Sequence, residues 1–221
     1  MLKDILAKMN IDITEREEML FDMYYRNLIT WNEKFNLTAV TARKDVDVKH
    51  FADSLSAARF FPRGATVVDV GSGAGFPAIP LKIVRRDLDI TMLDSLQKRV
   101  NFLLDTLAVL DLEGKAFHLR AEEAAYTDMR EHFDVATARA VANTKLLVQY
   151  LLPLVKVGGR AVLYKSGDVD AEIKEAEGAI KTLGGRITIK ERCDFEGMGR
   201  TVIVIDKAFS TPTAYPRRKI K

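Results

Sequence analysis

The sequence has very little cysteine and no long apolar run. Its single cysteine among 221 residues, Cys193, cannot form an internal disulfide, which fits a protein of a reducing compartment. No hydrophobic stretch approaches the roughly 20 residues that a transmembrane helix needs, and the opening Met1-Leu-Lys-Asp lacks the apolar core of a signal peptide. We therefore expect a cytoplasmic protein without a membrane partner.

Residues for metal and covalent chemistry are also scarce. The three histidines, His50, His118 and His132, lack the spacing of a metal site, so we expect no metal. No cysteine lies beside the fourth or fifth predicted strand, so attack on a pyrimidine carbon has no nucleophile. All six prolines are isolated, which excludes an Asn-Pro-Pro-aromatic turn that would hold an exocyclic amine.

The charge balance excludes less. The formal net charge is only +3, which is weak evidence for a polyanionic partner. The last six residues, 216–221, read Pro-Arg-Arg-Lys-Ile-Lys and carry four cations and no acid. Such a basic tail is either a solubilising terminus or an arm that binds phosphate.

What the sequence does contain is a glycine-rich turn after a buried strand. Residues 66–80 read Thr-Val-Val-Asp-Val-Gly-Ser-Gly-Ala-Gly-Phe-Pro-Ala-Ile-Pro, with the glycines at Gly71, Gly73 and Gly75. The dinucleotide fingerprint needs its third glycine where this chain has Phe76, and no Gly-Lys-Ser/Thr follows. A G-x-G-x-G turn preceded by Asp69 suits a ligand without phosphates, such as S-adenosylmethionine. The alternative is a glycine-rich turn that binds no ligand.

The next predicted strand favours the ligand. Residues 89–94 end in Asp94, about 20 residues past the glycines, where a carboxylate can accept both hydroxyls of an adenosine ribose. Asp94 could instead cap the following helix, or do both.

The periodicity divides the chain into three parts. Residues 1–62 predict a helical extension, with a capping box at Thr14 and Glu17 and a second helix over 45–61. Residues 63–207 alternate strands and helices, and 208–221 form the basic tail. Helices are expected over 96–110, 144–155 and 169–183, and strands over 66–70, 89–94, 115–120, 133–138, 160–165, 186–192 and 201–206. This pattern predicts an α/β fold: a doubly wound, Rossmann-like sheet of about seven strands, the last two in an antiparallel hairpin.

Ligands of such sheets bind at the carboxyl ends of the central strands. The chain presents there Gly71 to Gly75, Asp94, the pair Ala121-Glu122, Arg139 and Lys165. Methyl transfer from a sulfonium needs alignment more than acids or bases, and a ring nitrogen such as guanine N7 needs no proton removed. Arg139 and Lys165 could clamp phosphate or the guanine O6. Alternatively, Arg139 pairs with Asp69 or Glu122, and Lys165 is a strand-end lysine in water.

Several strings resemble one family. They occur in one order and cover about residues 25 to 206: Asn-Leu-Thr-Ala-Val at 36–40, His-x-x-Asp-Ser-Leu at 50–55, Val-Gly-Ser-Gly-Ala-Gly-Phe-Pro-Ala-Ile-Pro-Leu-Lys-Ile at 70–83, Leu-Asp-Ser-Leu-Gln-Lys-Arg-Val-Asn-Phe-Leu at 93–103, Arg-Ala-Glu-Glu at 120–123 and Ala-Arg-Ala-Val-Ala at 138–142. Together they resemble the glucose-inhibited-division protein B family, bacterial 16S rRNA guanine-N7 methyltransferases of the class I fold. The chain departs from the family's pattern at Ser166, where related sequences often have glycine.

The resemblance implies a function and site residues. Gly71, Phe76, Ala121, Glu122 and Arg139 would contact S-adenosylmethionine, which leaves as S-adenosylhomocysteine, and Lys165 would lie near the target base. The partner would be 16S rRNA or the small ribosomal subunit, with the enzyme expected to be a monomer. Loss of activity in the family is linked to low-level streptomycin resistance. The competing hypotheses are a donor-binding RNA chaperone or assembly factor without turnover, and a small-molecule or protein methyltransferase.

Overall fold

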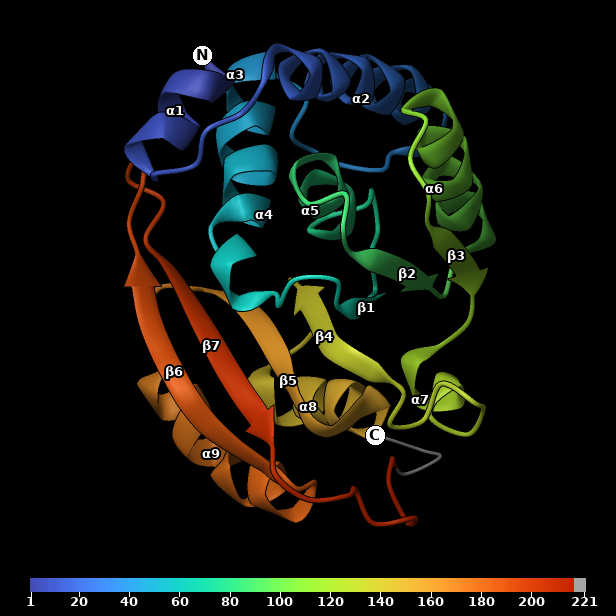
Figure 1. Ribbon diagram of the computed structural model, residues 1–221, viewed down its shortest axis with the longest axis vertical. Helices are drawn as coiled ribbons and strands as arrows, with labels where there is room; N and C mark the ends of the chain where they lie inside the picture. The colour runs from blue at the N-terminus through green and yellow to red at the C-terminus, as the bar shows by residue number, and fades with distance from the viewer. Residues whose placement is uncertain (217–221) are drawn as a thin grey trace.

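A seven-stranded sheet forms the centre of the molecule, as the computed structural model of residues 1–216 shows (Figure 1). Its order is β3-β2-β1-β4-β5-β7-β6. The strands are β1 (Thr66–Val70), β2 (Asp89–Asp94), β3 (Lys115–His118), β4 (Phe133–Arg139), β5 (Val155–Ser166), β6 (Gly185–Cys193) and β7 (Arg200–Lys207). The first five strands pair in parallel, and β7 runs antiparallel to both β5 and β6. The expected α/β sheet and its closing hairpin are confirmed.

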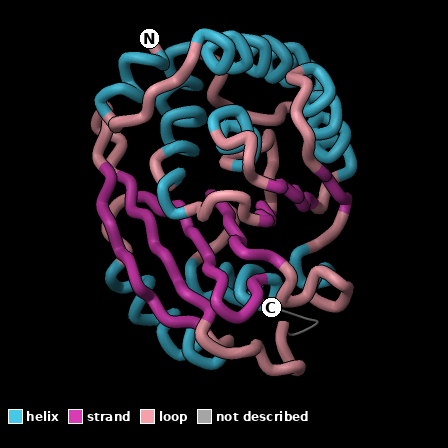
Figure 2. The backbone as a smooth tube through the Cα atoms, in the orientation of Figure 1, coloured by secondary structure: helices cyan, strands magenta, loops and turns pink. Residues whose placement is uncertain are grey.

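Helices cover both faces of the sheet, because alternate residues of a strand point to opposite faces. In β1, Val67 belongs to one buried cluster, while Val68 and Val70 belong to the other. The helices are α5 (Ala78–Val84), α6 (Gln97–Val109), α7 (Ala121–Ala124), α8 (Thr144–Leu151) with its 3-10 extension η3 (Leu152–Leu154), and α9 (Asp170–Thr182). The Val68 side packs against α8 and α9, and the Val67 side against α5, α6 and the N-terminal helices (Figure 2).

The N-terminal part adds more helices than the sequence predicted. The expected long helix, α2 (Glu15–Phe35), begins at the predicted capping box: the Glu17 N–H donates to Thr14 Oγ1 at 3.2 Å, and the Thr14 N–H donates to the Glu17 carboxylate at 2.7 Å. Along this helix, Leu20, Tyr24 and Leu28 are buried. The preceding α1 (Leu2–Lys8) was not predicted, since it is only seven residues long and has no side-chain cap.

The prediction of a single regular helix over residues 45–61 is wrong. It begins earlier, as α3 (Arg43–Val46), continues as the π-helical η1 (Asp47–Ala52), ends as α4 (Asp53–Leu55), and is followed by the 3-10 turn η2 (Ala58–Phe60). A π turn adds a residue per turn and is frequent at functional sites. It lets Phe51 bury against α2 while its neighbour His50 faces Phe76.

Three smaller expectations also need correction. The third strand ends at His118 rather than residue 120. The helix expected from 96 begins one residue later, so Leu96 is its exposed N-cap and is not one of the buried residues of the helix. The fifth strand begins at Val155, which pairs with Phe133 of β4, so the helix expected over 144–155 ends earlier and the strand expected from 160 begins earlier.

Hydrogen bonds hold the segment after β7 and the end of β7 against the rest of the fold. Arg130 donates to the carbonyls of Thr211 (2.9 Å) and Tyr215 (2.8 Å), and buried Lys207 donates to the carbonyl of Leu152 (2.6 Å). Residues 217–221, the last five residues of the predicted basic tail, lie outside the described residues. Within residues 1–216 there is no helix with the length and apolarity to cross a membrane.

Candidate active site

A cavity of about 810 Å³ opens at the carboxyl edge of the sheet. Loops after β1, β4 and β5, the β6–β7 hairpin and the N-terminal helical part all contribute to its wall. The structure brings five of the predicted site residues together in this wall: Gly71, Gly73, Phe76, Arg139 and Lys165. The topology argument therefore found the cavity from strand ends alone.

The glycine loop leaves one side open to the cavity. Gly71, Gly73 and Gly75 have φ of 69°, 58° and 88°, a left-handed conformation that side chains disfavour. A Cβ on Gly71 would lie 2.8 Å from Val141, and one on Gly75 would lie 2.6 Å from Ile79. At Gly73 the nearest atom would be 3.9 Å away, so that side faces open space. The loop is thus packed at two glycines and bare at the third, which fits a ligand that approaches the main chain.

Asp94 braces this loop from the tip of β2. Its carboxylate is 2% exposed and accepts hydrogen bonds from the N–H groups of Gly73 and Leu96, both at 2.9 Å. The Arg99 guanidinium lies 3.4 Å away. The bond to Leu96 does not make Asp94 the cap of α6, because the N-cap of that helix is Leu96 itself and no side chain caps it. The bond to Gly73 ties the loop to β2, and binding of a ribose by Asp94 stays a prediction.

The other predicted residues, Ala121 and Glu122, are not among those that line the cavity. The Leu119 N–H donates to the Asp94 carbonyl at 3.1 Å, so α7 begins next to the tip of β2. Ala121 is buried at the start of that helix, and the Glu122 carboxylate lies 3.7 Å from Arg120. Contact between this pair and a ligand stays a prediction.

Arg139 at the end of β4 has a partner that sequence reasoning missed. Its guanidinium donates to the Asp53 carboxylate and to the Lys49 carbonyl, both at 2.8 Å, and lies 5.0 Å from the ring centre of Phe76. The expected partners were Asp69 or Glu122. Asp53 lies 86 positions earlier in the sequence, so no local pattern indicated the pair.

Asp53 joins the N-terminal helical part to the strand ends. Only 1% exposed, it accepts from Arg139 with one oxygen and from Arg200 of β7 with the other, at 2.9 Å. Arg200 also donates to Ser166 Oγ at 2.9 Å. The string His-x-x-Asp-Ser had marked this position without indicating its role.

His50 forms an uncharged wall of the cavity. Its ring stacks on Phe76 with centres 4.4 Å apart, and Nε2 lies 2.9 Å from Thr38 Oγ1. Burial, reinforced by the nearby positive charge of Arg139, lowers the pKa of His50 to about 4. The imidazole is therefore neutral at pH 7, and it faces the cavity without adding charge.

Lys165 at the end of β5 is not a lysine in open water. Its side chain is 11% exposed, and its ammonium donates to the Glu172 carboxylate at 2.7 Å and to the Ala142 carbonyl at 2.9 Å. Glu172 of α9 also lines the cavity and was not predicted. Its signal in the sequence is weak, because α9 carries several acids.

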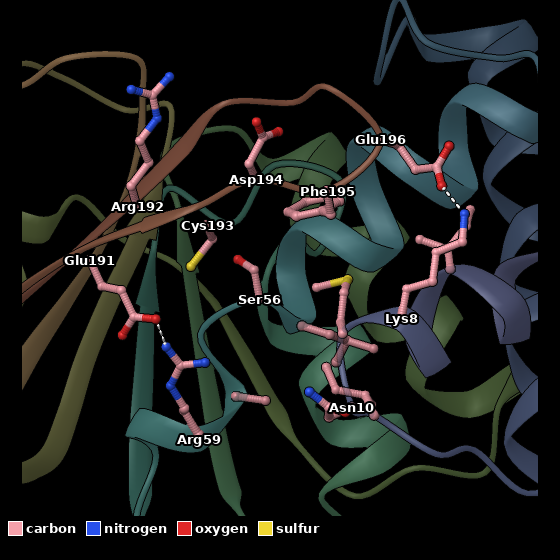
Figure 3. A pocket seen from close by; sticks show the side chains of 15 residues that line it. Lys8, Asn10, Ser56, Arg59, Glu191, Arg192, Cys193, Asp194, Phe195 and Glu196 are labelled. Carbon is pink, nitrogen blue, oxygen red and sulfur yellow. Dashed lines mark hydrogen bonds and ion pairs between the residues drawn. The ribbon is translucent and has the colours of Figure 1, made fainter.

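A second cavity, of about 660 Å³, lies between α1, the residues around η2 and the β6–β7 hairpin (Figure 3). Four of its charged groups form two ion pairs: Lys8 with Glu196 at 2.7 Å, and Arg59 with Glu191. Burial raises the pKa of the Cys193 thiol in its wall, which makes that cysteine a poor nucleophile. No predicted site residue lines this cavity, so we place the chemistry in the larger one. Within the described part of the chain, no cluster of three or more histidine, cysteine or acidic side chains could hold a metal.

Solved structures share this fold. The ribosomal protein L11 methylase of Lactobacillus delbrueckii subsp. bulgaricus aligns with a TM-score of 0.55 at 17% identity, over 73% of this chain and 80% of that one. TYW2 of P. horikoshii, solved in complex with MeSAdo, aligns with a TM-score of 0.55 at 14% identity, over 70% and 61% of the two chains. These two proteins therefore share their fold with this chain, whose glycine loop lies bare at the cavity.

Sequence comparisons identify the family. Residues 17–194 match the family described as GidB, rRNA small subunit methyltransferase G. The protein named ribosomal RNA small subunit methyltransferase G in Desulforamulus reducens is 43% identical over 98% of this chain and 93% of its own length. The protein of the same name in an Exiguobacterium species is 45% identical over 97% and 93%. The chain belongs to this family, which confirms the resemblance of the sequence strings.

Proposed function

We propose that this protein transfers the methyl group of S-adenosylmethionine to N7 of a guanine in 16S rRNA, and releases S-adenosylhomocysteine. The observation that carries the proposal is the cavity beside the bare side of Gly73, walled by Phe76, Arg139 and Lys165, in a chain of the rRNA small subunit methyltransferase G family. A cofactor that approaches main-chain atoms and carries no phosphate suits this loop.

Two sets of residues would hold the two halves of the donor. Gly71 and Gly73 would hold the amino acid end of the donor, and Asp94 with the Ala121-Glu122 pair would hold its adenosine. When bound, S-adenosylmethionine supplies an electrophilic methyl group, so the protein has only to orient the acceptor in line with it. The neutral ring of His50 stacked on Phe76 gives the wall a flat apolar surface against which a base can be held.

A ring nitrogen is the acceptor that this set of residues serves. Guanine N7 has a free lone pair, so no general base is required. Among the described residues of the cavity wall, the groups that could serve as a base are already engaged: His50 is hydrogen-bonded and stacked, Asp53 is bound by two arginines, and Glu172 is bound by Lys165 and Thr144. Guanine O6 lies next to N7 on the same edge and accepts hydrogen bonds from cationic side chains. Lys165 would donate such a bond.

The test is a methylation map at nucleotide resolution. Purified protein is incubated with labelled donor and either 16S rRNA or small ribosomal subunits, and the modified nucleotide is identified. Label on guanine N7 supports the proposal, whereas label on a pyrimidine or on protein, or donor binding without turnover on either RNA substrate, contradicts it.

Arg139→Ala gives a second test of the same site. It removes the guanidinium that lies over Phe76, and we expect turnover to fall at least about tenfold while the circular dichroism spectrum stays that of the folded chain. Unchanged turnover would remove Arg139 from the site.

We further propose that the enzyme acts as a monomer in the cytoplasm, where the small subunit is assembled, and that its loss gives low-level streptomycin resistance. Sedimentation of the purified chain tests the first statement. Streptomycin sensitivity of a deletion strain, with and without the Arg139→Ala copy, tests the last.

A further inference from the structure

Glu172 holds two parts of the cavity wall at once. Its Oε1 accepts a hydrogen bond from the Lys165 ammonium at 2.7 Å and from the Thr144 hydroxyl at 2.9 Å, and the Thr144 N–H donates to it as well. Thr144 begins α8, so the carboxylate from α9 satisfies a free N–H at the start of a neighbouring helix. These bonds join β5, α8 and α9 at one oxygen.

The ion pair fixes the direction of Lys165. An ammonium group has three N–H donors, and here Glu172 and the Ala142 carbonyl take two of them. The remaining donor belongs to a side chain that is 11% exposed and lines the cavity. Without Glu172, a flexible four-carbon stem would be free to turn the ammonium elsewhere.

The same contacts hold the loop between β4 and α8. Ala140 has φ of 57°, a left-handed conformation that is strained for a residue with a side chain. Next to it, Val141 packs on Gly71, and Ala142 accepts the bond from Lys165. A strained loop persists only where its surroundings hold it, and Lys165 and Glu172 hold this loop at its α8 end, through Ala142 and Thr144.

Pairing also removes a charge that would oppose the reaction. Methyl transfer from a sulfonium to a neutral base moves a positive charge onto that base. A lone ammonium in the wall would repel the charge as it forms, whereas an ammonium paired with a carboxylate would not. Partial burial alone would raise the pKa of Glu172, but the hydrogen bonds from Lys165 and Thr144 hold it below its usual value, so the carboxylate is ionised at pH 7.

We propose that Glu172 is a positioning residue for methyl transfer: it aims the third N–H of Lys165 into the cavity, holds the β4–α8 loop over Gly71, and neutralises the ammonium beside the target base. This inference rests on the proposed function. Glu172 acts through its hydrogen bonds with Lys165 and Thr144.

Glu172→Gln separates the charge from the shape. The amide oxygen can still accept from Thr144, so the start of α8 keeps its hydrogen bond while Lys165 loses its counter-ion. We expect kcat on small ribosomal subunits to fall about tenfold or more, with KM for the subunit and Kd for the donor changed less than about threefold. Glu175→Gln is the matched control, because Glu175 is an exposed acid one turn along the same helix. It should behave as the parent chain.

A double-mutant cycle shows whether Glu172 acts through Lys165. In a Lys165→Met background, Glu172→Gln should lower kcat by less than about twofold further, because its route is already broken. Glu172→Asp keeps the charge and should retain kcat within about threefold of the parent. If the Gln variant does not fold, the kcat of the Asp variant tests the inference instead.

Three results overturn the inference: a Gln variant with the kcat of Glu175→Gln, a loss of kcat that persists in full without Lys165, or an Asp variant as slow as the Gln variant. An inactive parent chain in the same assay is a different outcome, since it counts against the proposed function itself.

Discussion

Replacing Asp69 by asparagine should make the protein more stable, and the gain should depend on pH. Asp69 lies in the middle of β1, fully buried, and neither of its carboxylate oxygens has a hydrogen-bond partner with good geometry among residues 1–216. Burial raises its pKa from 3.8 to about 7; the nearby Ser72 hydroxyl and Ala78 N–H, followed by the charge of Arg139, limit the rise. Ionisation of Asp69 near pH 7 therefore destabilises the folded state.

The sign follows from comparing the two states. Between pH 4 and pH 7 the unfolded chain releases the Asp69 proton and the folded chain keeps it, so the free energy of unfolding falls as pH rises through this window. A difference of about three pH units between the two pKa values corresponds to about 4 kcal/mol, reached above pH 7. Asparagine has the same shape and no proton to lose, so the variant should match the parent near pH 4 and exceed it by about 4 kcal/mol at pH 8.

Urea unfolding at pH 5 and pH 8 measures this difference, with the fluorescence of Trp31, the single tryptophan, as the probe. By the same arithmetic, the gap between Asp69→Asn and the parent should widen by about 3 kcal/mol from pH 5 to pH 8. His50 has the opposite slope: its pKa is lowered to about 4, so its contribution is lost as pH falls below 6.5. The contribution of His50 is the same in the parent and in Asp69→Asn, so it cancels from the difference between their free energies of unfolding. A gap that stays constant with pH would refute the reasoning.

Two further predictions concern the cavity wall. Gly73→Ala places a methyl group in the open side of the loop, so the Kd for S-adenosylmethionine measured by calorimetry should rise at least about tenfold. The control is Gly158→Ala, which should leave the Kd unchanged, because Gly158 also has a positive φ (87°) but lies away from the cavity. Equal affinities of the two variants would contradict binding of the donor at the glycine loop. Asp53→Asn removes the buried charge shared by Arg139 and Arg200, so the free energy of unfolding in urea should fall by about 3 kcal/mol. A loss below about 0.5 kcal/mol would show that the two arginines are held by other contacts.

Local patterns predicted much of the fold. The capping box of α2 needs only Thr14 and Glu17, three positions apart, and the structure has both of its hydrogen bonds. Seven strands, their alternation with helices and the closing hairpin also follow from apolar periodicity and short connections. The residues at the strand ends, such as Arg139 and Lys165, were then placed at one edge by topology, and both line the cavity.

Partners distant in sequence were not predictable in the same way. Arg139 could have met Asp69 or Glu122 by position, but Asp69 is buried beneath the glycine loop and Glu122 lies near Arg120 on α7. The actual partner, Asp53, reaches the site because η1 and α4 dock on the strand ends. The helix expected over residues 45–61 gave no sign of the π turn, since its residues have ordinary helical patterning and the turn is imposed by packing.

By itself, the sequence determined the glycine loop and the two strands beside it. A buried strand, three glycines that need positive φ and an acid at the end of the next strand set their local conformation without help from distant residues. Only the tertiary structure decided which charges meet, because pairs such as Asp53 with Arg139 form when buried ionised groups must find a counter-ion within reach. It also decided that Lys165 is held by Glu172, since three elements must pack before one carboxylate oxygen can serve them all.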